Sequence, residues 1–285
     1  MSVVSIQSHV VYGHVGNRAA VFPLELVGHE VWPINTVQLS NHRGYDSCMG
    51  EVFTGGHIEL LWSGIKALGL LPECDALLSG YLGSVEIGAS MVAAVADIKA
   101  VNPSALYCCD PVMGDYGKGM YVEPGLPEFL AESALGWADI VTPNQFEAEY
   151  LSGIVIDSLD SARSACDLIR AKGPRIVLIT GFKPRVADAS TISMFMASEA
   201  GYHTISTPEL PLDPAPHGAG DLCAALFLGR YLVRRDAVKA LELCSNALYS
   251  VMLRSQFARS RELKLIESRD DILKPKNRFR ARRIR

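Results

Sequence analysis

The sequence predicts an α/β fold in which a three-layer, doubly wound and mostly parallel sheet lies between helices. Short apolar runs rich in Val, Ile and Leu alternate with longer segments of helical periodicity as far as Thr180. Such alternation is typical of parallel strands joined by crossover helices. We expect a single domain over residues 1–260, followed by an extension over residues 261–285 with a basic tail.

Each element is predicted from its own pattern. The parallel strands are expected at residues 3–7, 30–37, 76–79, 105–109, 140–142 and 175–180. The helices between them are expected at residues 18–26, 57–68, 85–100, 145–152 and 158–171. Residues 191–197 and 202–207 flank a short turn and predict an antiparallel hairpin at the sheet edge. Two apolar helices, residues 219–233 and 236–253, close the domain.

Composition favours a small-molecule partner. The formal net charge of −4 is spread along the 285 residues without a basic stripe before Lys274, which argues against nucleic acid and against a membrane surface. The N-terminus lacks a secretory signal, and no apolar run approaches the roughly 18 residues that span a bilayer, so we expect a cytoplasmic protein. The seven cysteines include no Cys-x-x-Cys pair and are expected to be reduced and mostly buried.

The end of the chain is strongly basic. Residues 274–285 hold seven Lys or Arg and no acidic residue. We expect this tail to be disordered or solvated, with contact to a partner or to nucleotide phosphate as the alternative.

A glycine-rich segment directly precedes the first of the two apolar helices. In His217-Gly218-Ala219-Gly220-Asp221, small residues allow backbone N–H groups at a helix N-terminus to approach an anion such as phosphate. Asp221 beside that cradle has the chemistry to accept the proton of a hydroxyl that attacks a γ-phosphoryl group. The alternative interpretation of Gly-x-Gly-Asp is a capping turn in which Asp caps the helix.

Acidic and polar side chains follow two further strands. Asp110 and Asp115 come after the strand at 105–109, and Thr142, Asn144 and Glu147 follow the strand at 140–142. Ligands bind in open α/β sheets at the carboxyl ends of the strands, so we expect these side chains to share one rim. Oxygen ligands from Asp115 and Glu147 suit Mg²⁺, which bridges nucleotide phosphates.

Several of these segments together resemble pyridoxal kinases of the ribokinase-like superfamily. The resemblance runs in order from residue 3 to about residue 255 and is carried by Ser8-His9-Val10, Gly16-Asn17-Arg18, Ser40-Asn41-His42, Leu78-Ser79-Gly80-Tyr81, Asp110-Pro111-Val112-Met113-Gly114-Asp115, Thr142-Pro143-Asn144-Gln145-Phe146-Glu147 and Gly218-Ala219-Gly220-Asp221. Gly-x-Gly-Asp identifies only the superfamily, whereas Ser-His-Val and Ser-Asn-His are more specific to kinases of vitamin B6.

The resemblance implies ATP-dependent phosphorylation of the 5′-hydroxyl of pyridoxal, with ATP, Mg²⁺ and K⁺ as cofactors and a homodimer as the assembly. It makes Asp221 the catalytic base, Gly218, Ala219 and Gly220 the anion hole, and Ser8, Arg43 and Tyr81 the pyridoxal contacts. ATP would be bound by Asp110, Asp115, Thr142, Asn144, Glu147, Thr180, Gly181, Thr207, Pro208, Glu209 and Leu210. The metal ions would be held by Asp110, Asp115, Thr142 and Glu147.

One departure and two alternatives bear on the substrate. Arg43 stands where the family usually has Thr, and it is larger, charged and only a donor. A hydroxymethylpyrimidine kinase is the first alternative, because both substrates are flat rings that bear a CH₂OH group. The second is a sensor that binds pyridoxal without turnover, although such a protein needs no base like Asp221 beside the anion hole.

Overall fold

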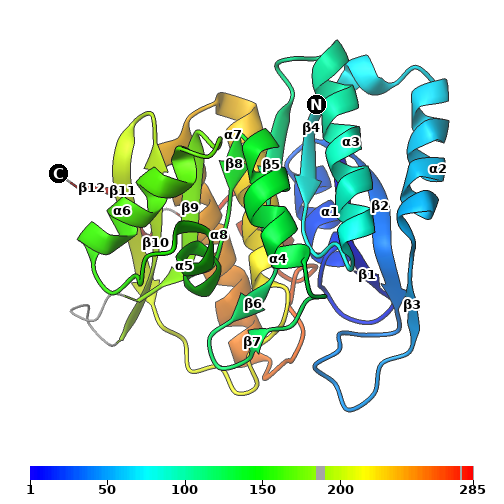
Figure 1. Cartoon of the computed structure of the whole chain (residues 1–285). Coiled ribbons are helices and arrows are strands. Elements are labelled where there is room, and N and C mark those ends of the chain that lie inside the picture. The colour runs from blue at the N-terminus through cyan, green and yellow to red at the C-terminus, as the bar shows by residue number, and fades with distance from the viewer. Residues whose placement is uncertain (184–189, 277, 285) are drawn as a thin grey trace.

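A mostly parallel sheet forms the centre of the molecule, as expected. The computed structural model describes residues 1–183, 190–276 and 278–284. Within these residues the sheet has ten strands in the order β12-β11-β10-β9-β8-β5-β4-β1-β2-β3 (Figure 1). Its parallel part consists of β1 (Ser2–Val10), β2 (Glu30–Leu39), β4 (Cys74–Ser79), β5 (Leu106–Cys109), β8 (Ile140–Val141) and β9 (Ile176–Phe182).

Antiparallel strands extend both sides of the parallel part. The predicted hairpin is present as β10 (Thr191–Ser198) and β11 (Gly201–Pro208), with β10 antiparallel to β9. On the other side β3 (Gly50–Val52) pairs with β2. β11 consequently runs in the same direction as β9. Its C-terminal end at Pro208 therefore lies on the same side of the sheet as the C-terminal ends of the parallel strands.

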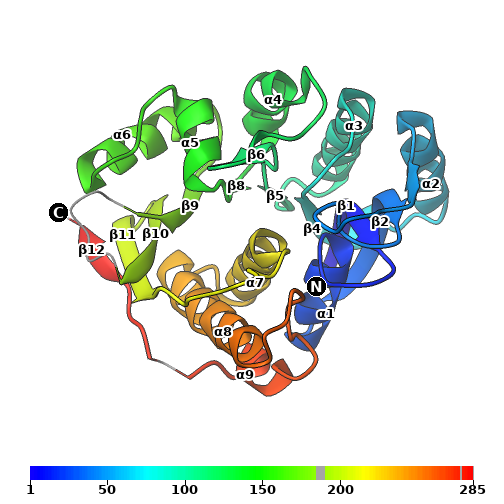
Figure 2. The ribbon, with the colours of Figure 1, turned by 90° about the horizontal axis from the view of Figure 1, so that it is seen from below.

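Helices cover both faces of the sheet (Figure 2). One face carries α1 (Asn17–Leu26), α7 (Ala219–Arg234), α8 (Ala237–Phe257) and α9 (Arg269–Leu273). The other face carries α2 (Gly55–Ala67), α3 (Val85–Val101), α4 (Leu126–Phe129), α5 (Gln145–Ser152) and α6 (Leu159–Arg170). The chain moves from β1 to β2 in one direction and from β4 to β5 in the other, so right-handed crossovers place α1 and α3 on opposite faces.

Two apolar cores result from this arrangement, one on each face of the sheet. The alternation of side chains along β1 sends Val3 to the core beneath α1 and α7, and Val4 and Ile6 to the core beneath α2 and α3. These three side chains are fully buried or nearly so. Strands buried on both faces explain why the sequence shows continuous apolar runs rather than alternation.

The chain after residue 260 packs against this domain, and its end differs from the solvated tail that we expected. Leu263, Leu265 and Ile272 are fully buried in the core on the α7 side. Beyond them β12 (Arg282–Ile284) pairs with the edge of β11. Strand pairing satisfies backbone groups that an edge strand leaves open, so a basic segment can join the sheet, with Ile284 packed against the core.

A small hairpin and three short helical turns lie between β5 and β8. β6 (Gly114–Asp115) and β7 (Gly119–Met120) form the hairpin, and α4 continues into η2 (Leu130–Ala134) and η3 (Leu135–Trp137). The remaining short turn, η1 (Leu71–Glu73), precedes β4. The hairpin lies beside the strand ends, because the Asn144 side chain donates to the Gly114 carbonyl over 2.8 Å.

The cysteines agree with the prediction. All seven lie in the described part of the chain as free thiols, and each except Cys48 is buried. Among the residues that the structure describes, no helix has the length and apolar character needed to cross a bilayer.

Candidate active site

The predicted site residues meet where the carboxyl ends of the strands face the start of α7. β1 lies between β2 and β4, and the strand order reverses there. Such a reversal opens a crevice above the strand ends, where ligands of open α/β sheets bind. Ser8 lies near the end of β1, Asp110 follows β5, and Asp221 lies in the first turn of α7.

The start of α7 has the properties expected of an anion site. Gly218 is its N-cap residue with a φ of 89°, and no side chain caps the helix. A side chain at residue 218 would collide with the backbone carbonyl of His14, so glycine is required both by φ and by space. The N–H groups of the first turn therefore remain available to an anion. The alternative in which Asp221 caps the helix is wrong, because Gly218 is the cap.

The carboxyl group of Asp221 is prepared to exchange a proton near neutral pH. Burial raises its pKa to about 6, although hydrogen bonds from the backbone N–H groups of Gly16 and of Asp221 itself work in the opposite direction. A group with this pKa is mostly ionised at pH 7 and still basic enough to take a proton. That combination suits a general base.

Asp110 lies beside the anion site and has an unsatisfied oxygen. Its side chain is buried, and the Thr142 hydroxyl donates to its Oδ1 atom over 3.2 Å. The Oδ2 atom is buried without a hydrogen-bond partner. Burial and the nearby carboxylates of Glu147 and Asp221 raise the pKa of Asp110 well above its usual range. A buried acceptor with no donor is costly to the free protein and suits the binding of a cation.

Glu147 is held rigidly next to Asp110. Its Oε1 accepts the Met113 N–H over 3.0 Å, and its Oε2 accepts the Asn144 N–H over 2.9 Å in the capping box of α5. Burial raises the pKa of Glu147 to about 8, although these N–H groups lower it and the charge of exposed Asp115 raises it further. Asp110, Thr142, Glu147 and Asp115 are thus brought together as expected.

These residues fit Mg²⁺ bound partly through nucleotide phosphates. Among the described residues, no group of three or more His, Cys, Asp or Glu side chains is arranged to hold a metal ion by itself. Mg²⁺ characteristically takes one or two carboxylates and completes its shell with water and phosphate oxygens. The free Oδ2 of Asp110 supplies such a ligand.

The residues expected to bind ATP continue along the rim away from β1. Asn144 and Thr180 are bridge partners, and the Thr180 N–H donates to the Pro143 carbonyl over 2.8 Å. Gly181 is exposed with open space around it. Thr207 and Pro208 are the last residues of β11 and lead into the loop that carries Glu209 and Leu210. Lys183 forms an ion pair with Glu209. Lys183 thereby joins the two segments, a contact that sequence reasoning missed.

The residues expected to contact pyridoxal lie on the other side of Asp221. Ser8 is half-buried, and Gly16 packs so closely on it that a side chain at residue 16 would collide with the Ser8 hydroxyl. Tyr81 follows β4, where its carbonyl accepts the Thr36 hydroxyl over 2.7 Å. Arg43 is exposed in the loop between β2 and β3.

Three further groups join this side of the rim although no role was predicted for them. The rings of His42 and His217 stack with centroids 3.8 Å apart. Burial, with the charges of His217 and Lys118, lowers the pKa of His42 to about 4. Lys118 belongs to the β6–β7 hairpin, so its charge reaches the residue that directly precedes the anion hole. Their juxtaposition comes from segments distant in sequence, which local patterns do not reveal.

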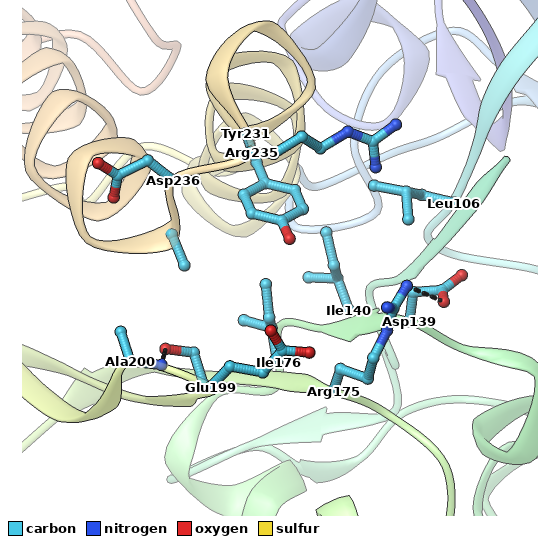
Figure 3. Close-up of a pocket in the computed structure, with 12 residues that line it drawn as sticks. Leu106, Asp139, Ile140, Arg175, Ile176, Glu199, Ala200, Tyr231, Arg235 and Asp236 are labelled. Atoms are coloured by element: carbon cyan, nitrogen blue, oxygen red, sulfur yellow. Dashed lines mark hydrogen bonds and ion pairs between the residues drawn. The ribbon is translucent and has the colours of Figure 1, made fainter. Parts of the chain in front are cut away.

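Neither of the two best-formed pockets coincides with this rim. A pocket of about 410 Å³ lies at the opposite edge of the sheet, where Leu106, Ile140 and Ile176 begin their strands (Figure 3). Arg175, which pairs with Asp139, and Tyr231 project into it. Another of about 390 Å³ lies along α1 and is lined by His9 and His14. In the described part of the chain, no predicted site residue lines either pocket.

Known proteins share both the sequence and the fold. A family model described as phosphomethylpyrimidine kinase matches residues 70–259. A pyridoxal kinase PdxY of Rubrobacter xylanophilus is 44% identical over 285 residues, which is 100% of this chain and 98% of that protein. A pyridoxal kinase PdxY of Deinococcus radiodurans is 46% identical over 287 residues, with 99% and 96% of the two chains covered.

A solved structure extends the comparison to three dimensions. Pyridoxal kinase from Leishmania donovani in complex with ADP and pyridoxamine has a TM-score of 0.91 and 30% identity, with 98% of each chain covered. The ribokinase-like fold expected from the sequence is thereby confirmed. With nearly complete coverage and more than 40% identity to its curated relatives, the chain belongs to the pyridoxal kinase family.

Proposed function

We propose that this protein transfers the γ-phosphoryl group of ATP to the 5′-hydroxyl of pyridoxal, with Asp221 as the general base. The observation that carries the proposal is the position of Asp221. This carboxyl group has a pKa of about 6 and lies in the first turn of a helix that has no side-chain cap at its N-terminus. Base and anion site are adjacent, as phosphoryl transfer to an alcohol requires. Relatives named pyridoxal kinase over the full chain length support the choice of substrate.

Each part of the rim has a distinct task in this mechanism. Asp221 accepts the proton of the vitamer hydroxyl as its oxygen attacks phosphorus, and the N–H groups of Gly218, Ala219 and Gly220 stabilise the charge on the transferred group. Ser8, Arg43 and Tyr81 orient the ring. Asn144, Thr180, Gly181, Thr207, Pro208, Glu209 and Leu210 position the nucleotide at the other end of the rim. Positioning and electrostatic stabilisation account for most catalysis of phosphoryl transfer.

The proposed cofactors are Mg²⁺ and K⁺. Asp110, Asp115, Thr142 and Glu147 would hold the cations, and the orphaned Oδ2 of Asp110 supports this assignment. When bound, Mg²⁺ neutralises charge on the phosphates during transfer. The raised pKa values of Asp110 and Glu147 describe a free site whose carboxylates lack a compensating positive charge.

The proposed assembly is a homodimer. Large apolar side chains are exposed on and beside the short edge strand β3 and on α2, namely Met49, Val52, Leu60 and Leu61. Burial of such side chains between two copies would remove apolar surface from water. Light scattering after gel filtration should give twice the mass of the chain, and Leu60→Glu should reduce it to the mass of one chain.

The proposed location is the cytoplasm. Free thiols at all seven cysteines suit a reducing compartment. The thiols of Cys223 and Cys244 lie 3.7 Å apart in the core without forming a disulfide.

The substrate is tested by measuring ADP release with Mg-ATP and each of pyridoxal, pyridoxine, pyridoxamine and hydroxymethylpyrimidine. We expect turnover of pyridoxal to exceed that of the pyrimidine. The family model described as phosphomethylpyrimidine kinase makes the pyrimidine the second candidate substrate. Turnover of the pyrimidine alone would reassign the enzyme, and tight binding of pyridoxal without turnover would establish the sensor.

A further inference from the structure

A buried carboxylate outside the catalytic rim joins two loops of the pyridoxal side. Glu262 is 7% exposed and follows the end of α8. Its Oε2 accepts the backbone N–H of His14 over 2.8 Å, and its Oε1 accepts the hydroxyl of Tyr45 over 2.7 Å. His14 belongs to the loop at residues 11–16, after β1, and Tyr45 belongs to the loop at residues 40–49, between β2 and β3. A single side chain thus fixes one loop against the other.

The preceding residue strengthens the same connection. The guanidinium carbon of Arg261 lies 4.6 Å from the centre of the Tyr45 ring. Its Nη2 atom donates to the carbonyl of Gly44 over 3.2 Å. Stacking on an aromatic face and donation to a carbonyl use the planar guanidinium, a combination that lysine does not reproduce. Arg261 and Glu262 therefore both contact the loop at residues 40–49, through Gly44 and Tyr45.

Both of these loops touch the segment that forms the anion hole. The His14 carbonyl packs against Gly218 so closely that a side chain there would collide with it. In the other loop, the Gly44 backbone packs against the His217 ring, and its N–H donates to Nδ1 of His42, which stacks on His217. Glu262 thus influences His217 and Gly218, which precede Asp221, indirectly through the two loops.

Glu262 itself is anchored firmly. The Glu262 N–H donates to the Ser260 hydroxyl over 3.1 Å, and that hydroxyl donates to the Glu262 carbonyl over 2.8 Å. The next apolar residues, Leu263 and Leu265, are fully buried in the core. Gly13 leaves room for the carboxylate, because any side chain at residue 13 would collide with it. A buried anchor that contacts two loops at once has the features of a positioning group.

We propose that Glu262 and Arg261 are positioning residues that hold the loop at residues 40–49 against the anion hole and thereby set the affinity for the vitamer. This inference rests on the proposed function, since the vitamer is the ligand whose binding is measured. Glu262 and Arg261 contact loop residues rather than reacting atoms. Their loss should therefore raise the KM for the vitamer, while the KM for ATP stays unchanged.

The kinetic test compares three variants with the wild type. Glu262→Ala removes both hydrogen bonds and should raise the KM for pyridoxal by at least about tenfold, the scale of a hydrogen bond to a charged group. Tyr45→Phe keeps the ring under Arg261 and should raise it by about fivefold. Glu267→Ala is the matched control, because this carboxylate is exposed and its ion pair with Lys264 is long, at 3.6 Å. Its kinetic constants should match those of the wild type.

A second readout does not depend on catalysis. Arg43 is an exposed trypsin site within the loop at residues 40–49. Cleavage after Arg43, followed by mass spectrometry without ligands, should be faster in Glu262→Ala and Tyr45→Phe than in the wild type and in Glu267→Ala. Tyr45→Phe loses only one hydroxyl, so its folding should remain intact even where Glu262→Ala is unstable.

The outcomes separate this inference from the proposed function. The positioning role would be overturned if the wild type is active and Tyr45→Phe has the same KM for pyridoxal and the same rate of cleavage after Arg43 as the wild type. An equal rise in the KM values of pyridoxal and ATP would also overturn it, since that pattern indicates general damage. If the wild type turned over no vitamer, the proposed function would fail, and the cleavage rates alone would decide whether Glu262 holds the loop.

Discussion

A Cβ atom placed on Gly220 would lie 3.9 Å from Oδ2 of Asp110, so the anion hole and the acidic rim adjoin each other. Gly220 belongs to the same first turn of α7 as Asp221, so the unsatisfied Oδ2 atom of Asp110 lies next to that turn. Sites for a cation and for a phosphate in such proximity suit a nucleotide whose terminal phosphates carry a metal ion. Space around Gly220 is part of this arrangement, because a larger residue would narrow the gap.

The pH dependence of catalysis should report Asp221. Burial raises the pKa of this carboxyl to about 6, and only its ionised form accepts a proton. The kcat/KM for pyridoxal should therefore fall about tenfold per pH unit below about pH 6. Initial rates at low pyridoxal concentration over a pH series measure this directly. A profile that is flat between about pH 5 and pH 7 would mean that another group limits the reaction.

The stability of the ligand-free protein should decrease as pH rises above about pH 7. Asp110 and Glu147 have folded-state pKa values above their ordinary range, so the folded state binds more protons than the unfolded state. Their favourable contribution is fully present below the ordinary carboxyl pKa of about 4 and is lost as pH rises through the folded-state values, about 8 for Glu147. Histidines with lowered pKa values, such as His42 with a pKa of about 4, act in the opposite direction only below about pH 7. The melting temperature should thus be higher at about pH 7 than at about pH 8.5.

Asp110→Asn should flatten this dependence and abolish most activity. The amide oxygen can still accept from Thr142, while one of the two groups that titrate is gone and Glu147 remains. Differential scanning calorimetry of wild type and variant, with and without Mg-ADP, measures the effect. Asp160→Asn, at an exposed position in α6, is the control. A wild-type protein that gains stability between about pH 7 and about pH 8.5 would contradict the raised pKa values.

Glu209→Gln should weaken ATP binding with little effect on stability. Glu209 pairs with Lys183, and both side chains are substantially exposed, so the ion pair contributes at most about 1 kcal/mol. The pair nevertheless links the segment after β9 to the loop after β11, both expected to hold nucleotide. We expect a rise of about threefold or more in the KM for ATP, with the melting temperature unchanged. A rise in the KM for pyridoxal instead of the KM for ATP would show that this loop does not bind the nucleotide.

Arg43→Thr should change the preference among pyridoxal, pyridoxine and pyridoxamine. These vitamers differ at one ring substituent, and the variant exchanges a long cationic donor for a short hydroxyl. The ratios of kcat/KM for the three vitamers measure the change. Identical ratios in wild type and variant would show that Arg43 remains in solvent during catalysis, as it does in the free protein.

Long apolar elements were predictable because burial on both faces leaves a strong sequence signal. β4, β5 and the long helices α7 and α8 lie close to their predicted ranges. The strand at the C-terminus was not predictable, because β12 joins the sheet through its backbone and carries Arg282 and Arg283 on exposed positions. The β6–β7 hairpin escaped for a related reason: two-residue strands have no periodicity to detect.

The candidate site also contains residues that were predictable from the sequence and residues that were not. Asp110 directly follows β5, Glu147 lies in the first turn of the helix after β8, and Asp221 lies in the first turn of the apolar helix α7. The topology of the sheet was therefore sufficient to bring them together. Glu262 was missed because it lies in a polar stretch after α8 and its partners, His14 and Tyr45, are distant in sequence. Contacts of this kind depend on tertiary packing, and no local spacing marks them.

The central claim is that Asp221 is the base in phosphorylation of pyridoxal. The most direct test uses phosphorus NMR to monitor the formation of pyridoxal 5′-phosphate from pyridoxal and Mg-ATP by wild type and by Asp221→Ala. We expect the wild type to phosphorylate pyridoxal and an analogue without the 5′-hydroxyl to accept nothing. In Asp221→Ala, kcat should fall by at least about 100-fold while ATP binding by calorimetry stays intact. Undiminished product formation by Asp221→Ala would contradict the assignment of this residue as the base.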